Sequence, residues 1–161
     1  MSEISPAKRV ESGLVDALVE LSYVVQAELT DVAKQYGLTL AQARLLGILR
    51  DRQPGMLELA DHLGLDKSSV SGLVDRAAGR GLVTREPVAG DGRAYRVVIT
   101  AAGRDLARNA GATVNRRLAR RVGRLSEPQR TRLTAVIRQV LDDAGGLYRP
   151  PADSSAQQQR K

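Results

Sequence analysis

Two short amphipathic segments joined at a glycine limit the folds open to this chain. In residues 57–76, LELADHLGLDKSSVSGLVDR, small Ala60 falls where two helices would cross, and Gly64 tolerates a left-handed turn between them. Asp66 offers a carboxylate at an N-cap position. The second segment carries an apolar stripe at helical spacing, formed by Val70, Leu73, Val74 and Ala77. These spacings predict a helix-turn-helix, although any helical hairpin can carry Ala, Gly and Val at such places.

The apolar stripe leaves a polar face on the other side of the second helix. This face consists of Lys67, Ser68, Ser69, Ser71, Gly72, Asp75 and Arg76. Short hydroxyl side chains suit the floor of a DNA major groove, where they donate or accept hydrogen bonds at base edges, and a helix N-terminus favours phosphate. We therefore predict that this face contacts DNA.

A β-hairpin is predicted directly after this helix. LVTREP and AYRVVIT are rich in β-branched residues, and VAGDG between them supplies the glycines of a turn. A helix-turn-helix followed by a hairpin forms a winged helix, whose tip reaches the adjacent minor groove, where a guanidinium is favoured. We predict wing contacts from Asp91, Gly92 and Arg93, with Arg93 inserted and Asp91 holding it through a charge-assisted hydrogen bond. The alternative is a solvated loop arginine.

Helices are predicted on both sides of the winged helix. An uninterrupted apolar repeat predicts a long helix over residues 10–36, and Thr39 with Gln42 forms a capping box for the next. After the hairpin, Thr100 is placed to cap a second long helix. Another capping box, Ser126 with Gln129, begins the last. The chain is thus predicted to be mostly α-helical with a small β-hairpin.

Composition narrows the function classes. The chain has 25 Lys and Arg against 18 Asp and Glu, which favours a polyanionic partner. With no Cys and a single His, His62, it offers no disulfide framework and no metal cluster, and we expect no cofactor. No grouping of nucleophile and base points to an enzyme. The first residues lack a secretory signal and no apolar stretch is long enough to span a membrane, so we expect a cytoplasmic protein without a membrane partner.

The charges are unevenly distributed along the chain. Residues 1–31 hold two basic and six acidic side chains, whereas residues 104–132 hold nine arginines and two acidic side chains. We expect ion pairs between Glu20, Glu28 or Asp31 and the arginines of residues 104–124. Two alternatives are that these arginines are simply solvated, or that an anionic ligand is held by Arg116, Arg117 or Arg120. His62 is expected to face outward, solvated or near phosphate.

Three stretches resemble the MarR family of bacterial transcription regulators. They are LTLAQARLL, ELADHLGLDKSSVSGLVDRAAGRGLVTRE and DGRAYRVVITAAGR, and the resemblance extends from about Leu38 to Gly103. It implies a winged helix-turn-helix plus a helical dimerisation domain, in a homodimeric repressor that binds double-stranded DNA at a pseudo-palindromic operator. It also implies a possible small-molecule effector, although the absence of Cys excludes thiol sensing.

The resemblance divides the chain into four parts. Residues 1–37 form a dimerisation helix, 38–100 the DNA-binding domain, 101–147 the C-terminal dimerisation helices, and 148–161 a tail expected to be disordered. Dimerisation is expected to involve Leu14, Leu18, Leu21, Val136 and Val140. Two rival functions remain: a basic architectural protein that coats DNA without sequence preference, and a winged helix that serves only protein contacts.

Overall fold

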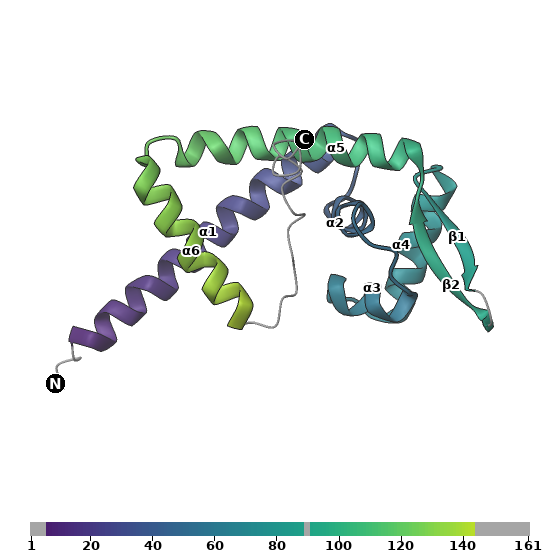
Figure 1. Ribbon diagram of the computed structural model, residues 1–161, viewed down its shortest axis with the longest axis horizontal. Helices are drawn as coiled ribbons and strands as arrows, with labels where there is room; N and C mark the ends of the chain where they lie inside the picture. Colours follow the sequence, from purple (N-terminus) through teal and green to yellow (C-terminus); the bar gives the residue numbers. More distant parts are fainter. Residues whose placement is uncertain (1–5, 89–90, 144–161) are drawn as a thin grey trace, which may run out of the picture.

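The computed structural model describes residues 6–88 and 91–143 and contains the predicted elements in the predicted order (Figure 1). The elements are α1 (Pro6–Gln35), α2 (Leu40–Leu49), α3 (Met56–Leu63), α4 (Lys67–Gly79), β1 (Val83–Val88), β2 (Asp91–Ile99), α5 (Ala101–Val122) and α6 (Glu127–Asp143). The predicted tail, 148–161, lies outside the described residues. Among the described helices, none combines the length and apolar character needed to cross a membrane.

The hydrophobic core is shared by α2, α3, α4 and the hairpin. Its most deeply buried side chains include Leu45, Leu46, Leu49, Leu59, Val70, Val74, Val83 and Val97. The predicted stripe of α4 is confirmed, because Val70, Leu73, Val74 and Ala77 are all buried. Burial of this stripe fixes which side of α4 faces solvent.

The turn between α3 and α4 has the predicted geometry. Gly64 adopts φ 64°, in the left-handed region that glycine occupies without strain, and ends α3. The Leu65 N–H then donates to the Ala60 carbonyl, 3.1 Å away, and Ala60 itself is buried at the crossing. The helix-turn-helix prediction is therefore confirmed.

Side-chain caps set where the helices begin. At α2 both hydrogen bonds of the Thr39–Gln42 capping box are present, at 3.1 and 3.0 Å. At α5 the Thr100 hydroxyl accepts from the Gly103 N–H and donates to the Gly81 carbonyl, 2.7 Å away. At α6 the Gln129 side chain accepts from the Ser126 N–H, which is one half of the predicted box. These local contacts confirm the predicted helix starts.

The two strands form an antiparallel ribbon whose base is packed against α5. Val83 pairs with Ile99, and the register shifts near the tip, between Pro87 and Val88. A Cβ on Gly103 would overlap the Leu82 carbonyl oxygen and lie 2.9 Å from Ile99 Cγ1. Only glycine permits this approach, which joins the start of α5 to the base of the wing.

Helices α1, α5 and α6 extend away from the winged helix (Figure 1). α5 runs from the base of the hairpin along α1, and α6 turns back at its far end. Apolar side chains of α1 and α6 are exposed there, including the predicted dimerisation residues Leu14 (62%), Leu18 (48%), Leu21 (49%), Val136 (51%) and Val140 (53%). A single copy of the chain leaves these faces uncovered.

Candidate nucleic-acid interface

The polar face of α4 is open to solvent. Lys67, Ser68, Ser69, Asp75 and Arg76 are exposed, and Ser71 and Gly72 are half-buried. The opposite side of the same helix forms part of the core. The structure therefore confirms the predicted outward face, while contact with DNA stays a prediction.

A compact hydrogen-bond cluster caps the N-terminus of α4. The Asp66 carboxylate accepts from the Ser69 N–H at 2.9 Å and from the hydroxyls of Ser68 and Ser69 at 2.5 and 2.6 Å. These hydrogen bonds hold the pKa of Asp66 well below its usual value, and the bond from the Ser68 hydroxyl has the largest effect. The carboxylate stays ionised, and both hydroxyl hydrogens point toward it.

Asp75 is paired with the wing. Its carboxylate lies 2.7 Å from Arg85 Nη1 on β1. The sequence pattern placed Asp75 on the outward face and gave no sign of this partner, because the nine intervening residues include the end of a helix and a turn. The pair ties the exposed face of α4 to the first strand of the hairpin.

Arg76 folds back along α4. Its Nη1 lies 3.2 Å from the position that a Cβ on Gly72 would occupy. The missing side chain at Gly72 therefore leaves room for a guanidinium beside the exposed face. This placement brings a positive charge next to Gly72.

The wing contributes the predicted residues Asp91, Gly92 and Arg93 through β2. Asp91 pairs with Val88 across the hairpin. The side chains of residues 91–94 and the turn at 89–90 lie outside the described part of the chain. The roles of Arg93 and of the Asp91–Arg93 contact thus stay predictions.

A cation joins the C-terminal end of α4 to the turn between α1 and α2. Arg80 Nη1 donates to the Gly37 carbonyl at 2.8 Å and to Gln42 Oε1 at 3.3 Å. Gln42 is itself buried and belongs to the cap of α2. No local sequence signal marks this link, since Gly37 and Arg80 are 43 residues apart.

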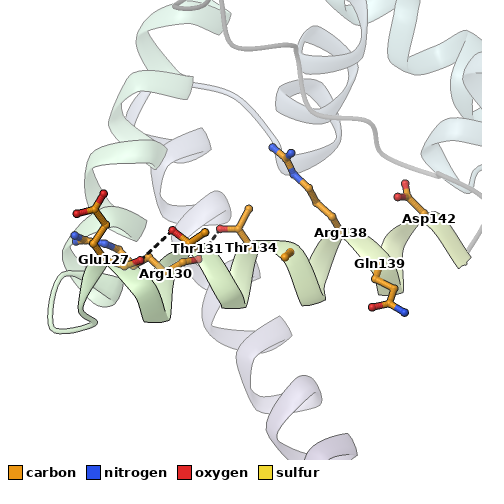
Figure 2. A pocket seen from close by; sticks show the side chains of 8 residues that line it. Glu127, Arg130, Thr131, Thr134, Arg138, Gln139 and Asp142 are labelled. Atoms are coloured by element: carbon orange, nitrogen blue, oxygen red, sulfur yellow. Dashed lines mark hydrogen bonds between the residues drawn. The ribbon is translucent and has the colours of Figure 1, made fainter.

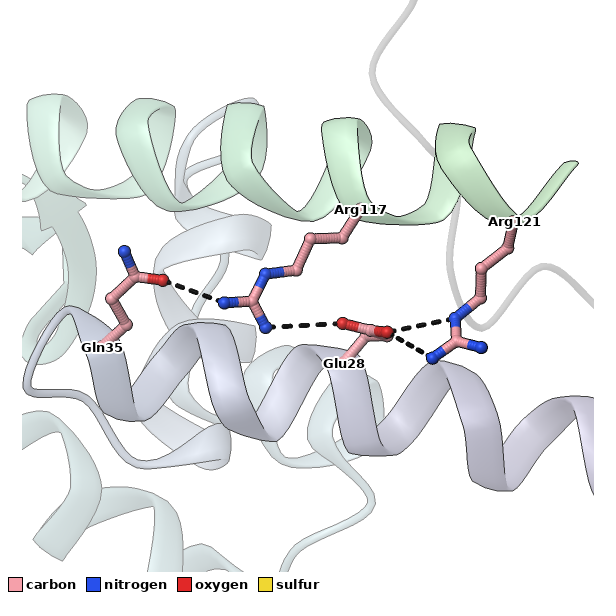
Figure 3. A network of polar contacts seen from close by, with 4 residues as sticks. All are labelled: Glu28, Gln35, Arg117 and Arg121. Atoms are coloured by element: carbon pink, nitrogen blue, oxygen red, sulfur yellow. Dashed lines mark hydrogen bonds and ion pairs between the residues drawn. The ribbon is translucent and has the colours of Figure 1, made fainter. Parts of the chain in front are cut away.

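Acidic α1 and arginine-rich α5 meet through one glutamate (Figure 3). Glu28 lies 3.4 Å from Arg117 and 2.6 Å from Arg121, and Arg117 also donates to Gln35 at 3.2 Å. The hydrogen bond from Arg121 is the largest cause of a lowered pKa of Glu28, and the hydrogen bond from Arg117 adds to it, while burial of the carboxylate opposes both. The expected pairing is confirmed for Glu28.

A second group of hydrogen bonds between the end of α1 and α5 lies closer to the winged helix than the Glu28 pairs. The Tyr36 hydroxyl lies 2.9 Å from Thr113 Oγ1, and Arg116 donates to the same Thr113 oxygen at 2.8 Å. Tyr36 also donates to the Asn109 carbonyl at 3.2 Å. Arg116 thus sits beside two hydroxyls where α1 and α5 approach α2.

His62 differs from its expected solvated position. Its side chain is 19% exposed, with Nε2 3.5 Å from Glu58 and 3.3 Å from Arg52 Nη1. Glu58 lies one turn earlier on α3, whereas Arg52 comes from the segment before that helix. His62 is therefore half-buried and not fully solvated, and its nearness to phosphate stays a prediction.

A groove of about 790 Å³ follows α6 (Figure 2). Its described lining comes from α6 alone, between Glu127 and Asp142. The hydroxyls of Thr131 and Thr134 donate to carbonyls of their own helix. No polar group from a second described element converges on it, so the groove does not form part of the candidate interface.

Known proteins resemble this chain in sequence and in fold. A sequence model of the MarR family matches residues 36–94. The HTH-type transcriptional repressor Rv2887 of Mycobacterium tuberculosis is 28% identical over 128 residues, which cover 78% of this chain and 91% of that protein.

Solved structures share the fold. That of RV1404 from Mycobacterium tuberculosis has a TM-score of 0.73 and 25% identity, covering 94% of this chain and 99% of that one. The complex of the Mycobacterium tuberculosis MarR family protein Rv2887 with salicylic acid has a TM-score of 0.64 and 24% identity, covering 86% and 98%. With its buried helix-turn-helix stripe and its wing, the chain is similar to the MarR family of winged-helix transcription regulators, whose sequence model matches residues 36–94.

Proposed function

We propose that this chain is a repressor that binds a specific pseudo-palindromic DNA site as a homodimer. The observation that carries the proposal is the polar, solvent-exposed face of α4, held outward by a fully buried stripe and followed directly by the hairpin. Such a helix fits a major groove while the wing reaches the neighbouring minor groove. Repression is supported by the similarity of this chain to the transcriptional repressor Rv2887.

The homodimer is supported by the uncovered apolar faces of α1 and α6. Residues 1–37 and 101–147 would form the dimerisation domain, and 38–100 the DNA-binding domain. Two copies related by a twofold axis present two α4 helices, so the half-sites would lie about 10–10.5 base pairs apart.

A small anionic effector is part of the proposal. It is supported by the salicylic acid complex of Rv2887 and by the position of Arg116 beside Tyr36 and Thr113. Arg117 is less suited, since Glu28 already binds it. This effector site is tested by titrating salicylate into the wild type and into Arg116→Ala and measuring the dissociation constants by calorimetry. Equal dissociation constants for the two proteins would show that Arg116 does not contribute to the site.

DNA binding is tested with fluorescent duplexes. DNA that copurifies with the protein is sequenced, and the enriched site is compared with a shuffled duplex by anisotropy at several salt concentrations. We expect tight binding to the enriched site and a loss of about tenfold or more for Arg93→Ala. Arg124→Ala, which removes the same charge from beyond the far end of α5, serves as the control.

The rival functions predict different outcomes. An architectural protein would bind the enriched and shuffled duplexes equally, with a steep salt dependence for both. A winged helix used only for protein contacts would show the same DNA binding before and after combined Arg93→Ala and Ser71→Ala substitution.

A further inference from the structure

The hydroxyl hydrogens of Ser68 and Ser69 are both committed to one carboxylate. Ser68 Oγ lies 2.5 Å from Asp66 Oδ1, and Ser69 Oγ lies 2.6 Å from Asp66 Oδ2. A serine hydroxyl has one hydrogen to donate and two lone pairs that accept. Each serine therefore has only acceptor capacity left for a partner in solvent.

Both serines are exposed on the first turn of α4. Base edges in the major groove carry donors as well as acceptors: the amino groups of adenine N6 and cytosine N4 donate, whereas guanine O6 and N7 and thymine O4 accept. A hydroxyl with no free hydrogen can bond the first set and not the second. The orientation of the two hydroxyl hydrogens would thus determine which base atoms can form hydrogen bonds with Ser68 and Ser69.

We propose that Ser68 and Ser69 act as hydrogen-bond acceptors for the amino groups of adenine or cytosine, because Asp66 holds their hydroxyl hydrogens. The proposal rests on the DNA-binding function proposed above and names the base atoms recognised at one part of that interface. Asp66 is then a positioning residue that acts through the two serines.

Turning a hydroxyl hydrogen from Asp66 toward a guanine or thymine oxygen is unfavourable. It would replace a hydrogen bond to an ionised carboxylate with a weaker one to a neutral acceptor. It would also remove a partner from an ionised group as DNA excludes water from it. The low pKa of Asp66 supports this, since the carboxylate remains charged wherever DNA binding is measured.

The test uses base analogues in the duplex that the full-length protein selects from a random pool. Single adenines in that duplex are replaced by purine, which lacks the N6 amino group, and single cytosines by 2-pyrimidinone, which lacks the N4 amino group. We expect at least one replacement to weaken wild-type binding by about tenfold. The same replacement should have no effect on Ser68→Ala or Ser69→Ala. In a matched control at a G·C position, 7-deazaguanine, which removes the N7 acceptor, should change the affinity of the wild type, Ser68→Ala and Ser69→Ala by the same factor.

Asp66→Asn provides a second variant that keeps a good N-cap residue. Its amide carries hydrogens of its own, so a serine hydroxyl next to it is free to donate, and we expect the base preference at the same position to relax. Circular dichroism checks that each variant retains its helices.

Two results would overturn the inference. In the first, wild-type affinity at every serine-dependent position is unchanged by loss of an amino group, or falls there on loss of guanine N7. Either outcome rules out the acceptor role of Ser68 and Ser69 and leaves sequence-specific binding intact. Failure of the pool to yield any preferred sequence removes the DNA-binding proposal together with this inference.

Discussion

Arg85 Nη1 on the first wing strand lies 2.7 Å from a carboxylate oxygen of Asp75 on α4. The contact joins the helix proposed to enter the major groove to the hairpin proposed to reach the minor groove. Both side chains are substantially exposed, 37% for Arg85 and 56% for Asp75. The pair therefore orients the wing more than it stabilises the fold.

A double-mutant cycle measures this pair. Urea unfolding of the wild type, Asp75→Asn, Arg85→Gln and the double variant, at one protein concentration, should give a coupling free energy of about 0.2–1 kcal/mol, because solvent screens exposed charges. Strictly additive effects would show that the two groups do not interact in solution.

Gly103→Ala should destabilise the protein. The new Cβ would overlap the Leu82 carbonyl oxygen, which belongs to the backbone and cannot rotate away. We expect a loss of about 1–3 kcal/mol of unfolding free energy, as for other overpacked sites. Gly47→Ala, in the interior of α2 with nothing within 4 Å of the new Cβ, is the matched control. It should raise stability by up to about 1 kcal/mol through helix propensity. Equal effects of the two substitutions would contradict the close approach at Gly103.

Glu28 should make the α1–α5 contact sensitive to acid. Its pKa is lowered in the folded state, so its stabilising contribution is complete above the pKa of the unfolded chain and is lost as the pH falls through the folded pKa. Glu28→Gln should consequently reduce the unfolding free energy at neutral pH, and the difference from wild type should shrink as the pH drops below about 4.5. Glu20→Gln, an exposed substitution on the same helix, should change little at either pH. A Glu28→Gln effect independent of pH would mean that charge is not its source.

Leu18→Asp should shift the proposed homodimer toward monomer. Leu18 is 48% exposed in the single chain, and a carboxylate there would lose its hydration if the second copy covered it. Leu57→Asp is the control, because Leu57 is 68% exposed on α3 within the winged helix. Sedimentation velocity should show a smaller species for Leu18→Asp alone, together with weaker DNA binding. An unchanged sedimentation coefficient would place the interface elsewhere.

The order and type of the elements were predictable from the sequence because their signals are local. A cap such as Thr39–Gln42 and the stripe from Val70 to Ala77 involve residues within one to three helical turns of each other. Gly64 likewise acts within its own turn. The helix-turn-helix and the outward face of α4 follow from these patterns, since burial of one side of a helix leaves the other exposed.

The partners of individual polar groups were decided by the tertiary structure. Charge counts indicated that α1 and α5 attract each other, but only the crossing of the two helices selected Glu28 over Glu20 and Asp31. In the same way, the Arg80–Gly37 bond and the Asp75–Arg85 pair join residues brought together by the core. Helix periodicity and capping depend on neighbours along the chain, whereas a side chain's distant partner depends on how packed helices and strands cross. Packing of buried apolar side chains sets that crossing, and no single segment of the sequence contains it.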